Sequence, residues 1–129
     1  MTGNNINQRA VTPRPGLWRA AFWGAALFAL VMASLPQPPL LPGTPSDKIQ
    51  HIIAFVTLSG LAAFAYPAAR VLVIFLALAG FGGAIELVQA IPALHRDASL
   101  LDWIADTASV GITLAAVAAL RLVRSRHSA

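Results

Sequence analysis

All the acidic residues of this sequence lie at or near one end of an apolar segment. There are five of them, namely Asp47, Glu86, Asp97, Asp102 and Asp106. A carboxylate in an apolar environment is costly unless it is paired, protonated or bound to a ligand. These positions therefore indicate where binding or catalysis is to be expected.

Polar residues recur at helical spacing in three segments, so that each pair shares one face of a helix. The pairs are Asp47 with His51, Glu86 with Gln89, and Asp102 with Asp106. In a membrane helix such a face turns toward the bundle interior, because lipid offers no hydrogen-bond partners. We therefore expect the three faces to meet in one polar cleft.

Within this cleft, His51, Glu86 and Asp106 are the candidate catalytic residues. Glu86 lies near a helix C-terminus, where the helix dipole disfavours an anion, and the other two lie a turn too deep to be simple caps. A histidine paired with a carboxylate would serve as a general base, and Glu86 as a general acid. The candidate ligand-binding residues are Asp47, Lys48, Gln89, Arg96 and Asp102.

Structural roles are open for several of these residues. Asp47 and Asp102 stand at positions that fit a capping box behind Thr44 and Ser99. Lys48 fits an interfacial anchor, and an ion pair between Glu86 and Arg96 is an alternative to a functional cleft. The five acids outnumber the two nearby cations, Lys48 and Arg96. A bound divalent cation is one way to balance this negative charge. A set of oxygen ligands with one histidine suits such an ion.

The elements that must position these residues are membrane helices. The chain has 129 residues, 57% of them hydrophobic and 11% charged, and a mean hydropathy of +0.70. Its apolar residues form four runs, each of about spanning length: 17–35, 49–66, 71–90 and 100–122. We predict an all-α integral membrane protein, an antiparallel four-helix bundle. Residues 1–16 are predicted to form a disordered cytoplasmic tail, 17–122 the transmembrane domain and 123–129 a second cytoplasmic tail.

Lys and Arg residues predict the orientation. With both termini in the cytoplasm, all but Lys48 and Arg96 of the nine basic residues lie inside. The net charge of +4 is thus explained by topology, and no nucleic-acid partner is expected. A cleavable signal peptide ending near Ala33 is an alternative for the first run, although its length favours retention. The chain has no cysteine, which excludes disulfides and thiol nucleophiles.

The order of these motifs resembles the VanZ-like family of bacterial membrane proteins. The resemblance covers roughly residues 17–122 and is carried by four segments: Asp47-Lys48-Ile49-Gln50-His51, Glu86-Leu87-Val88-Gln89, Arg96-Asp97-Ala98-Ser99 and Asp102-Trp103-Ile104-Ala105-Asp106. The chain departs from the family pattern at Asp106, where Asn is usual, and at Ser109, where Gly often stands. The family is named after a member linked to low-level teicoplanin resistance. The resemblance implies a role in the cell envelope, in the plasma (inner) membrane.

Three functions are compatible with these features. The first is recognition of a polar group of an envelope molecule, such as a lipid-linked precursor or a glycopeptide, with membrane lipids as further partners. The second is hydrolysis or group transfer on a lipid head group. The third is a role as an ion or proton transport subunit or as an assembly partner. The sequence predicts no polar path through the cytoplasmic half of the bundle, which is an argument against transport.

Overall fold

The computed structural model describes residues 14–36 and 46–127. It contains four long helices, α1 (Pro15–Ser34), α2 (Asp47–Ala65), α3 (Val71–Gln89) and α4 (Leu100–His127), and a short 3-10 helix, η1 (Pro92–Leu94). All four long helices have the length and apolar composition needed to cross a membrane. The described chain is therefore an all-helical, multi-pass membrane protein, as the sequence predicts.

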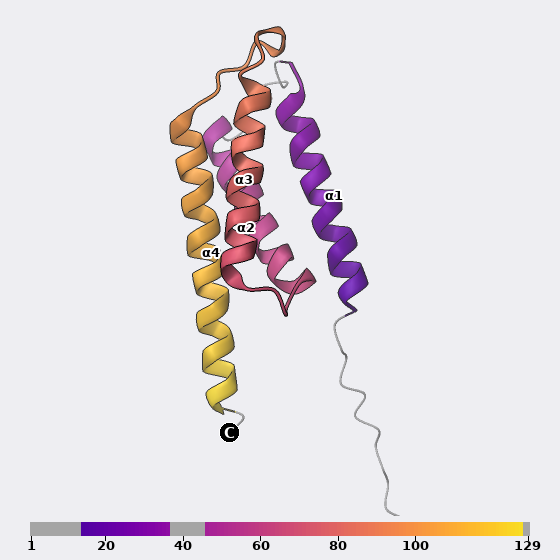
Figure 1. Ribbon diagram of the computed structural model, residues 1–129, viewed down its shortest axis with the longest axis vertical. Coiled ribbons are helices and arrows are strands. Elements are labelled where there is room, and N and C mark those ends of the chain that lie inside the picture. Colours follow the sequence, from indigo (N-terminus) through magenta and orange to yellow (C-terminus); the bar gives the residue numbers. More distant parts are fainter. Residues whose placement is uncertain (1–13, 37–45, 128–129) are drawn as a thin grey trace, which may run out of the picture.

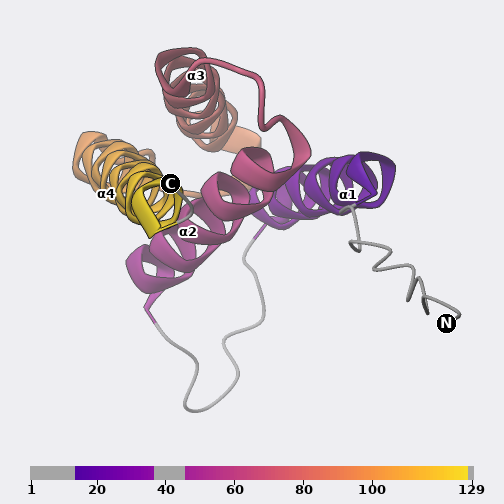
Figure 2. The same ribbon diagram turned by 90° about the horizontal axis from the view of Figure 1, so that it is seen from below.

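The four helices run up and down beside one another, and α2 is the central one (Figure 1). It packs against each of the other three, most extensively against α4 and α1. Figure 2 shows α1 and α4 on opposite sides of α2. Because consecutive helices are antiparallel, the start of α2, the end of α3 and the start of α4 lie at the same end of the bundle.

The central place of α2 follows from its sequence. Its buried residues His51, Phe55, Leu58, Ala62 and Ala65 recur at alternating spacings of four and three, which forms a continuous stripe on one helix face. The other helices bury fewer residues and expose large apolar side chains outward. The outward-facing apolar side chains suit contact with lipid. The buried stripe of α2 therefore lines the interior of the bundle.

Close contact between α3 and α4 depends on a glycine. A Cβ atom at Gly82 would lie 3.2 Å from Cζ of Phe55 and 3.4 Å from Cδ1 of Trp103. The indole of Trp103 also donates a hydrogen bond to the carbonyl of Ala79 on α3, at 2.9 Å. Small residues allow membrane helices to approach closely, and here the space is filled by two aromatic rings.

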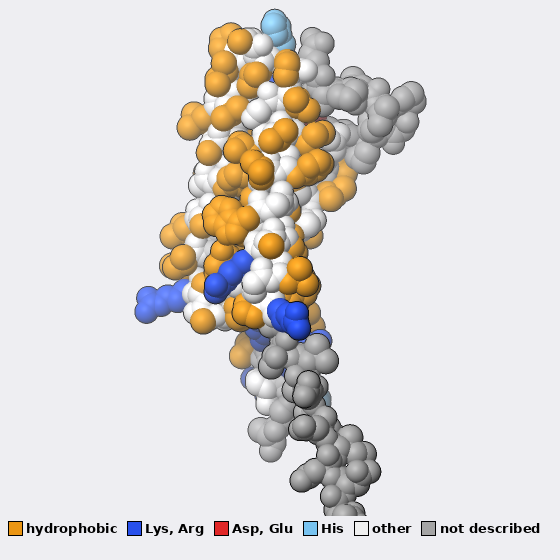
Figure 3. Space-filling model, turned by 90° about the vertical axis from the view of Figure 1, so that its right-hand side faces the viewer, with side chains coloured by type: hydrophobic (Ala, Val, Ile, Leu, Met, Phe, Trp, Pro, Cys, Tyr) orange, Lys and Arg blue, Asp and Glu red, His pale blue; other side chains and the backbone are white. Residues whose placement is uncertain are grey.

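Basic side chains gather toward one end of the bundle (Figure 3). The acids with described partners lie at the other end, near the start of α2, the end of α3 and the start of α4. Two of the basic side chains close the C-terminus of α2: Arg121 donates to the carbonyl of Ala63 at 2.6 Å, and Arg19 to that of Ala65 at 3.3 Å. A cation at this position satisfies free carbonyl groups and interacts favourably with the helix dipole.

Some helix boundaries differ from the prediction. Helix α1 starts at Pro15, inside the predicted tail 1–16, because proline suits the first position of a helix. Helix α4 continues to His127, beyond the predicted end at residue 122, because Arg124 and Arg126 are favourable in the last turn of a helix. Residues 1–13 of the first predicted tail, residues 37–45 of the proline-rich segment between α1 and α2, and residues 128–129 of the second predicted tail lie outside the described residues.

Candidate functional site

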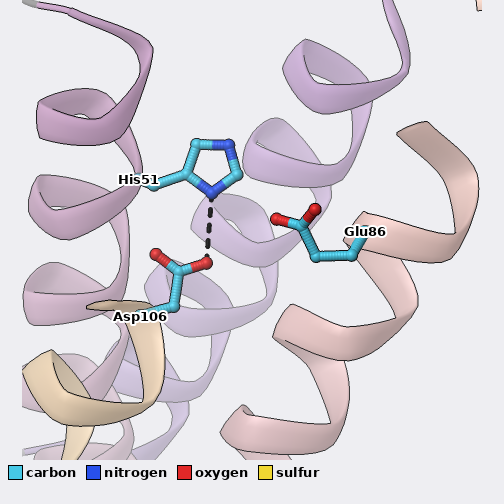
Figure 4. Close-up of side chains that lie close together, drawn as sticks. All are labelled: His51, Glu86 and Asp106. Carbon is cyan, nitrogen blue, oxygen red and sulfur yellow. Dashed lines mark hydrogen bonds and ion pairs between the residues drawn. The ribbon is translucent and has the colours of Figure 1, made fainter. Parts of the chain in front are cut away.

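Three side chains from three different helices converge near the end of the bundle that carries the acids. They are His51 of α2, Glu86 of α3 and Asp106 of α4, and one possible ligand atom from each lies within 4.8 Å of the others. Figure 4 shows the two carboxyl groups and the imidazole turned toward one another. The structure thus brings together the three candidate catalytic residues; their chemical roles remain predictions.

The shortest contact within this group joins His51 and Asp106. Nδ1 of His51 lies 3.1 Å from Oδ2 of Asp106, and the side chains are only 9% and 1% exposed. In the tautomer that carries its hydrogen on Nδ1, the ring donates to this carboxylate. The contact fixes the orientation of the imidazole, since a buried polar group is held where its partner lies.

Glu86 has a structural contact that sequence reasoning missed. Its Oε2 accepts a hydrogen bond from the backbone N–H of Ser99, at 2.7 Å, and Ser99 is the residue before α4. The hydroxyl of Ser99 in turn accepts a bond from the N–H of Asp102, at 3.3 Å. Glu86 therefore lies at the N-terminus of α4, where the helix dipole favours an anion. This offsets the unfavourable position of Glu86 near the end of its own helix.

Two ion pairs flank the central group. Arg96 donates from Nη2 to both carboxylate oxygens of Asp47, at 3.1 and 3.3 Å. Lys48 lies 3.3 Å from Asp102. Arg96 thus contacts Asp47 and not Glu86, the partner considered from the sequence. Its guanidinium side chain is 9% exposed although its partner is half exposed.

Several buried polar atoms of the site have no hydrogen-bond partner among the described residues. They include one carboxylate oxygen each of Glu86 and Asp106, Nη1 of Arg96 and Nε2 of Gln89. Buried polar groups in proteins are almost always satisfied, so atoms of this kind indicate an additional partner. Gln89 is buried as predicted. His95 and Asp97 are exposed in the loop, as expected for solvated loop residues, and lie outside the central group.

A groove between α1 and α2 leads to this site. It has a volume of about 400 Å³, and apolar side chains form most of its wall, among them Ala25, Phe28, Ala29, Ile53 and Phe55. Its polar lining comes mainly from Asp47, Gln50, His51 and Arg96. From Thr57 to Asp47 the groove follows about 15 Å of α2, at the helical rise of about 1.5 Å per residue.

The sequence alone did not predict this groove. The only available signal is a row of small residues on α1, Ala25, Ala29 and Ala33, spaced so that they lie on one face. Such a row also suits close packing, and whether two helices meet or separate there depends on the rest of the bundle.

Comparisons of the chain with models of known families, with curated proteins and with solved structures find no match.

Proposed function

We propose that this chain is a VanZ-like protein of the bacterial plasma (inner) membrane, with both termini in the cytoplasm. In this proposal it recognises an amphiphilic molecule of the cell envelope, such as a lipid-linked precursor, through the polar end of the groove between α1 and α2. The observation that carries the proposal is this groove, because its long apolar wall ends at charged and polar side chains.

The shape and chemistry of the groove match an amphiphile. Its volume of about 400 Å³ is within the range of small-molecule sites, about 300–1,000 Å³. Because the groove lies between membrane helices, its apolar wall suits an acyl or prenyl chain. A head group would lie beside His51 and Arg96, which are both lining residues.

The head group is proposed to be anionic, and Arg96 supports this choice. Its Nη2 is bonded to Asp47, while its buried Nη1 has no partner among the described residues. A guanidinium group binds carboxylate and phosphate oxygens through several nitrogens at once. A phosphate at the polar end of the groove would satisfy this donor.

A binding measurement tests the proposal directly. Purified full-length protein in detergent is titrated with a long-chain polyprenyl phosphate, and the bound fraction is measured by native mass spectrometry. Ala29→Phe, which fills the groove, is expected to weaken binding at least about tenfold, since one large side chain takes up much of a site of this size. Ala21→Phe on the exposed part of α1 is the matched control and should bind as the wild type does.

Arg96→Gln should weaken binding of the phosphate but not of the corresponding polyprenol, whereas Arg70→Gln at the other end of the bundle should affect neither. Equal binding by the wild type and Ala29→Phe would contradict the proposal.

A cellular measurement tests the envelope role. Glu86→Ala, Arg96→Ala and Asp102→Ala are expressed at matched levels in a bacterial host, and susceptibility to glycopeptide and other envelope-directed drugs is measured. We expect at least one of the three variants to differ from the wild type, and Arg70→Ala to behave as the wild type. If none of the three changes susceptibility, the role in the envelope is contradicted.

A second candidate function, hydrolysis or group transfer on a lipid head group, is favoured by one contact. His51 is oriented by Asp106 at 3.1 Å, as a general base requires. Incubation of the purified protein with a labelled polyprenyl diphosphate, with and without divalent metal, tests this candidate. A labelled product lost in His51→Gln supports it, and the absence of any product excludes it for this substrate class.

A further inference from the structure

Among the described residues, two carboxylates of the site have no lysine or arginine partner. Arg96 pairs with Asp47, and Lys48 pairs with Asp102. Glu86 and Asp106 remain, and both face His51 (Figure 4). A protonated imidazole would balance only one negative charge, so two ionised carboxylates at this depth need a further positive charge.

The unpartnered oxygens lie on these same two residues. One oxygen of Glu86 and one of Asp106 are buried with no hydrogen-bond partner among the described residues, and the Asp106 side chain is 1% exposed. A carboxylate oxygen without a donor is free to ligate a cation. The cluster is thus more than an acidic patch, because it combines an imidazole, two carboxylates and buried oxygens that lack partners.

We infer that His51, Glu86 and Asp106 form a binding site for one divalent transition-metal cation, of the class of Mn²⁺ or Zn²⁺. The imidazole favours these ions over Mg²⁺ and Ca²⁺, and the carboxylates favour them over softer metals. Cis ligands at about 2.1 Å from an octahedral ion are about 3.0 Å apart. The separation of 3.1 Å between Nδ1 of His51 and Oδ2 of Asp106 is close to this value, and on metal binding the ion would replace the hydrogen shared by these two atoms. The three ligand atoms lie within 4.8 Å of one another, so a small adjustment of the side chains would bring them to one ion.

The cation site adjoins the groove. His51 belongs to both, since it is a member of the cluster and a lining residue of the groove. Three protein ligands leave coordination positions for other ligands, as in catalytic zinc sites. The inference concerns the metal alone and does not depend on what occupies the groove, so the two proposals are tested separately.

Metal binding is measured on tag-free, full-length protein in chelator-free detergent. Mn²⁺ is titrated and the free ion is followed by electron paramagnetic resonance; Zn²⁺ is then added as a competitor. We expect one Mn²⁺ per chain, displaced by Zn²⁺ and not by Mg²⁺. Wild-type protein that binds neither Mn²⁺ nor Zn²⁺ at one equivalent overturns the inference, whatever the variants do.

Near-isosteric variants identify the ligands. His51→Gln, Glu86→Gln and Asp106→Asn should each lower the affinity for Mn²⁺ by at least about tenfold, since even changes outside the ligand shell have effects of that size. Asp97→Asn is the matched control, because this exposed acid lies at the same end of the bundle. Variants are compared only if circular dichroism shows wild-type helix content. Unchanged affinity in all three folded variants, or an equal loss in Asp97→Asn, also overturns the inference.

Discussion

The two oxygens of Glu86 have different surroundings. Oε2 accepts the backbone N–H of Ser99, and Oε1 is buried without a partner among the described residues. One residue therefore combines a structural contact, which holds the start of α4, with an oxygen free to bind a ligand. Substitutions at this position separate the two roles.

Glu86→Ala removes both oxygens and should lower the free energy of unfolding by about 1–3 kcal/mol, because the N–H of Ser99 then lacks its acceptor. Glu86→Gln keeps a carbonyl oxygen and should lose less than half of that amount. Unfolding in detergent, followed by circular dichroism, measures both. Asp97→Ala, in the loop that contains Ser99, is the control. Equal losses for Ala and Gln would show that the bond to Ser99 does not hold α4.

Arg121 makes a second side-chain contact between helices that can be tested by substitution. Its Nη2 donates to the carbonyl of Ala63 in the last turn of α2. Arg121→Met removes the donor and the charge but keeps the apolar length of the side chain. We expect a loss of about 0.5–2 kcal/mol in the free energy of unfolding. Both residues are exposed, but Arg126 lies in the last turn of the helix, away from the carbonyl of Ala63. Arg126→Met should therefore be nearly neutral; a loss of similar size there would point to net charge rather than to the bond of Arg121.

At the scale of elements, the site depends on how closely α3 approaches its neighbours. Gly82 faces Phe55 of α2 and Trp103 of α4, whereas a side chain at Gly80 would meet open space. The two glycines stand half a helical turn apart on one helix, so the same substitution has different consequences at each.

Gly82→Leu should destabilise the bundle by about 1–3 kcal/mol, since it forces two aromatic rings to move. Gly80→Leu should leave the thermal unfolding midpoint close to that of the wild type. Both are measured in the same detergent. Equal midpoints for the two variants would mean that α3 and α4 do not pack as described.

The charge distribution of the described residues bears on the orientation. The acids and their partners lie near the start of α2, the end of α3 and the start of α4. Arg19 and Arg121 contact the C-terminus of α2, and Arg70 precedes α3, at the other end of the bundle, where Figure 3 shows a group of basic side chains. Basic ends of membrane proteins stay in the cytoplasm. In this orientation the proposed site would open toward the outside of the membrane.

Cysteine labelling tests this orientation, because the chain has no cysteine of its own. Asp97→Cys and Ser125→Cys place one thiol at each end of the bundle. The cells used have an intact plasma membrane and an outer membrane or cell wall that the reagent can pass. In such cells, a maleimide that does not cross the plasma membrane should label Asp97→Cys alone. Ser125→Cys should react only after the membrane is disrupted. The reverse pattern would invert the proposed topology and place the site on the cytoplasmic side.

The sequence by itself determined the helices. A bilayer admits only segments that satisfy their own backbone hydrogen bonds over about 20 apolar residues, and this requirement is local. For that reason the predicted segments agree with α2 and α3 to within two residues. Helical periodicity also placed His51, Glu86 and Asp106 on inward faces.

The sequence predicted that three polar helix faces meet, but the tertiary structure alone decided which side chains within them contact one another. Arg96 contacts Asp47, Glu86 contacts Ser99, and α1 leaves a groove beside α2. Each of these facts depends on the rotation of a helix about its axis and on the angle between neighbouring helices. Both are set by side-chain packing between residues far apart in the chain, such as Phe55, Gly82 and Trp103. Spacing within one segment carries no information about that packing.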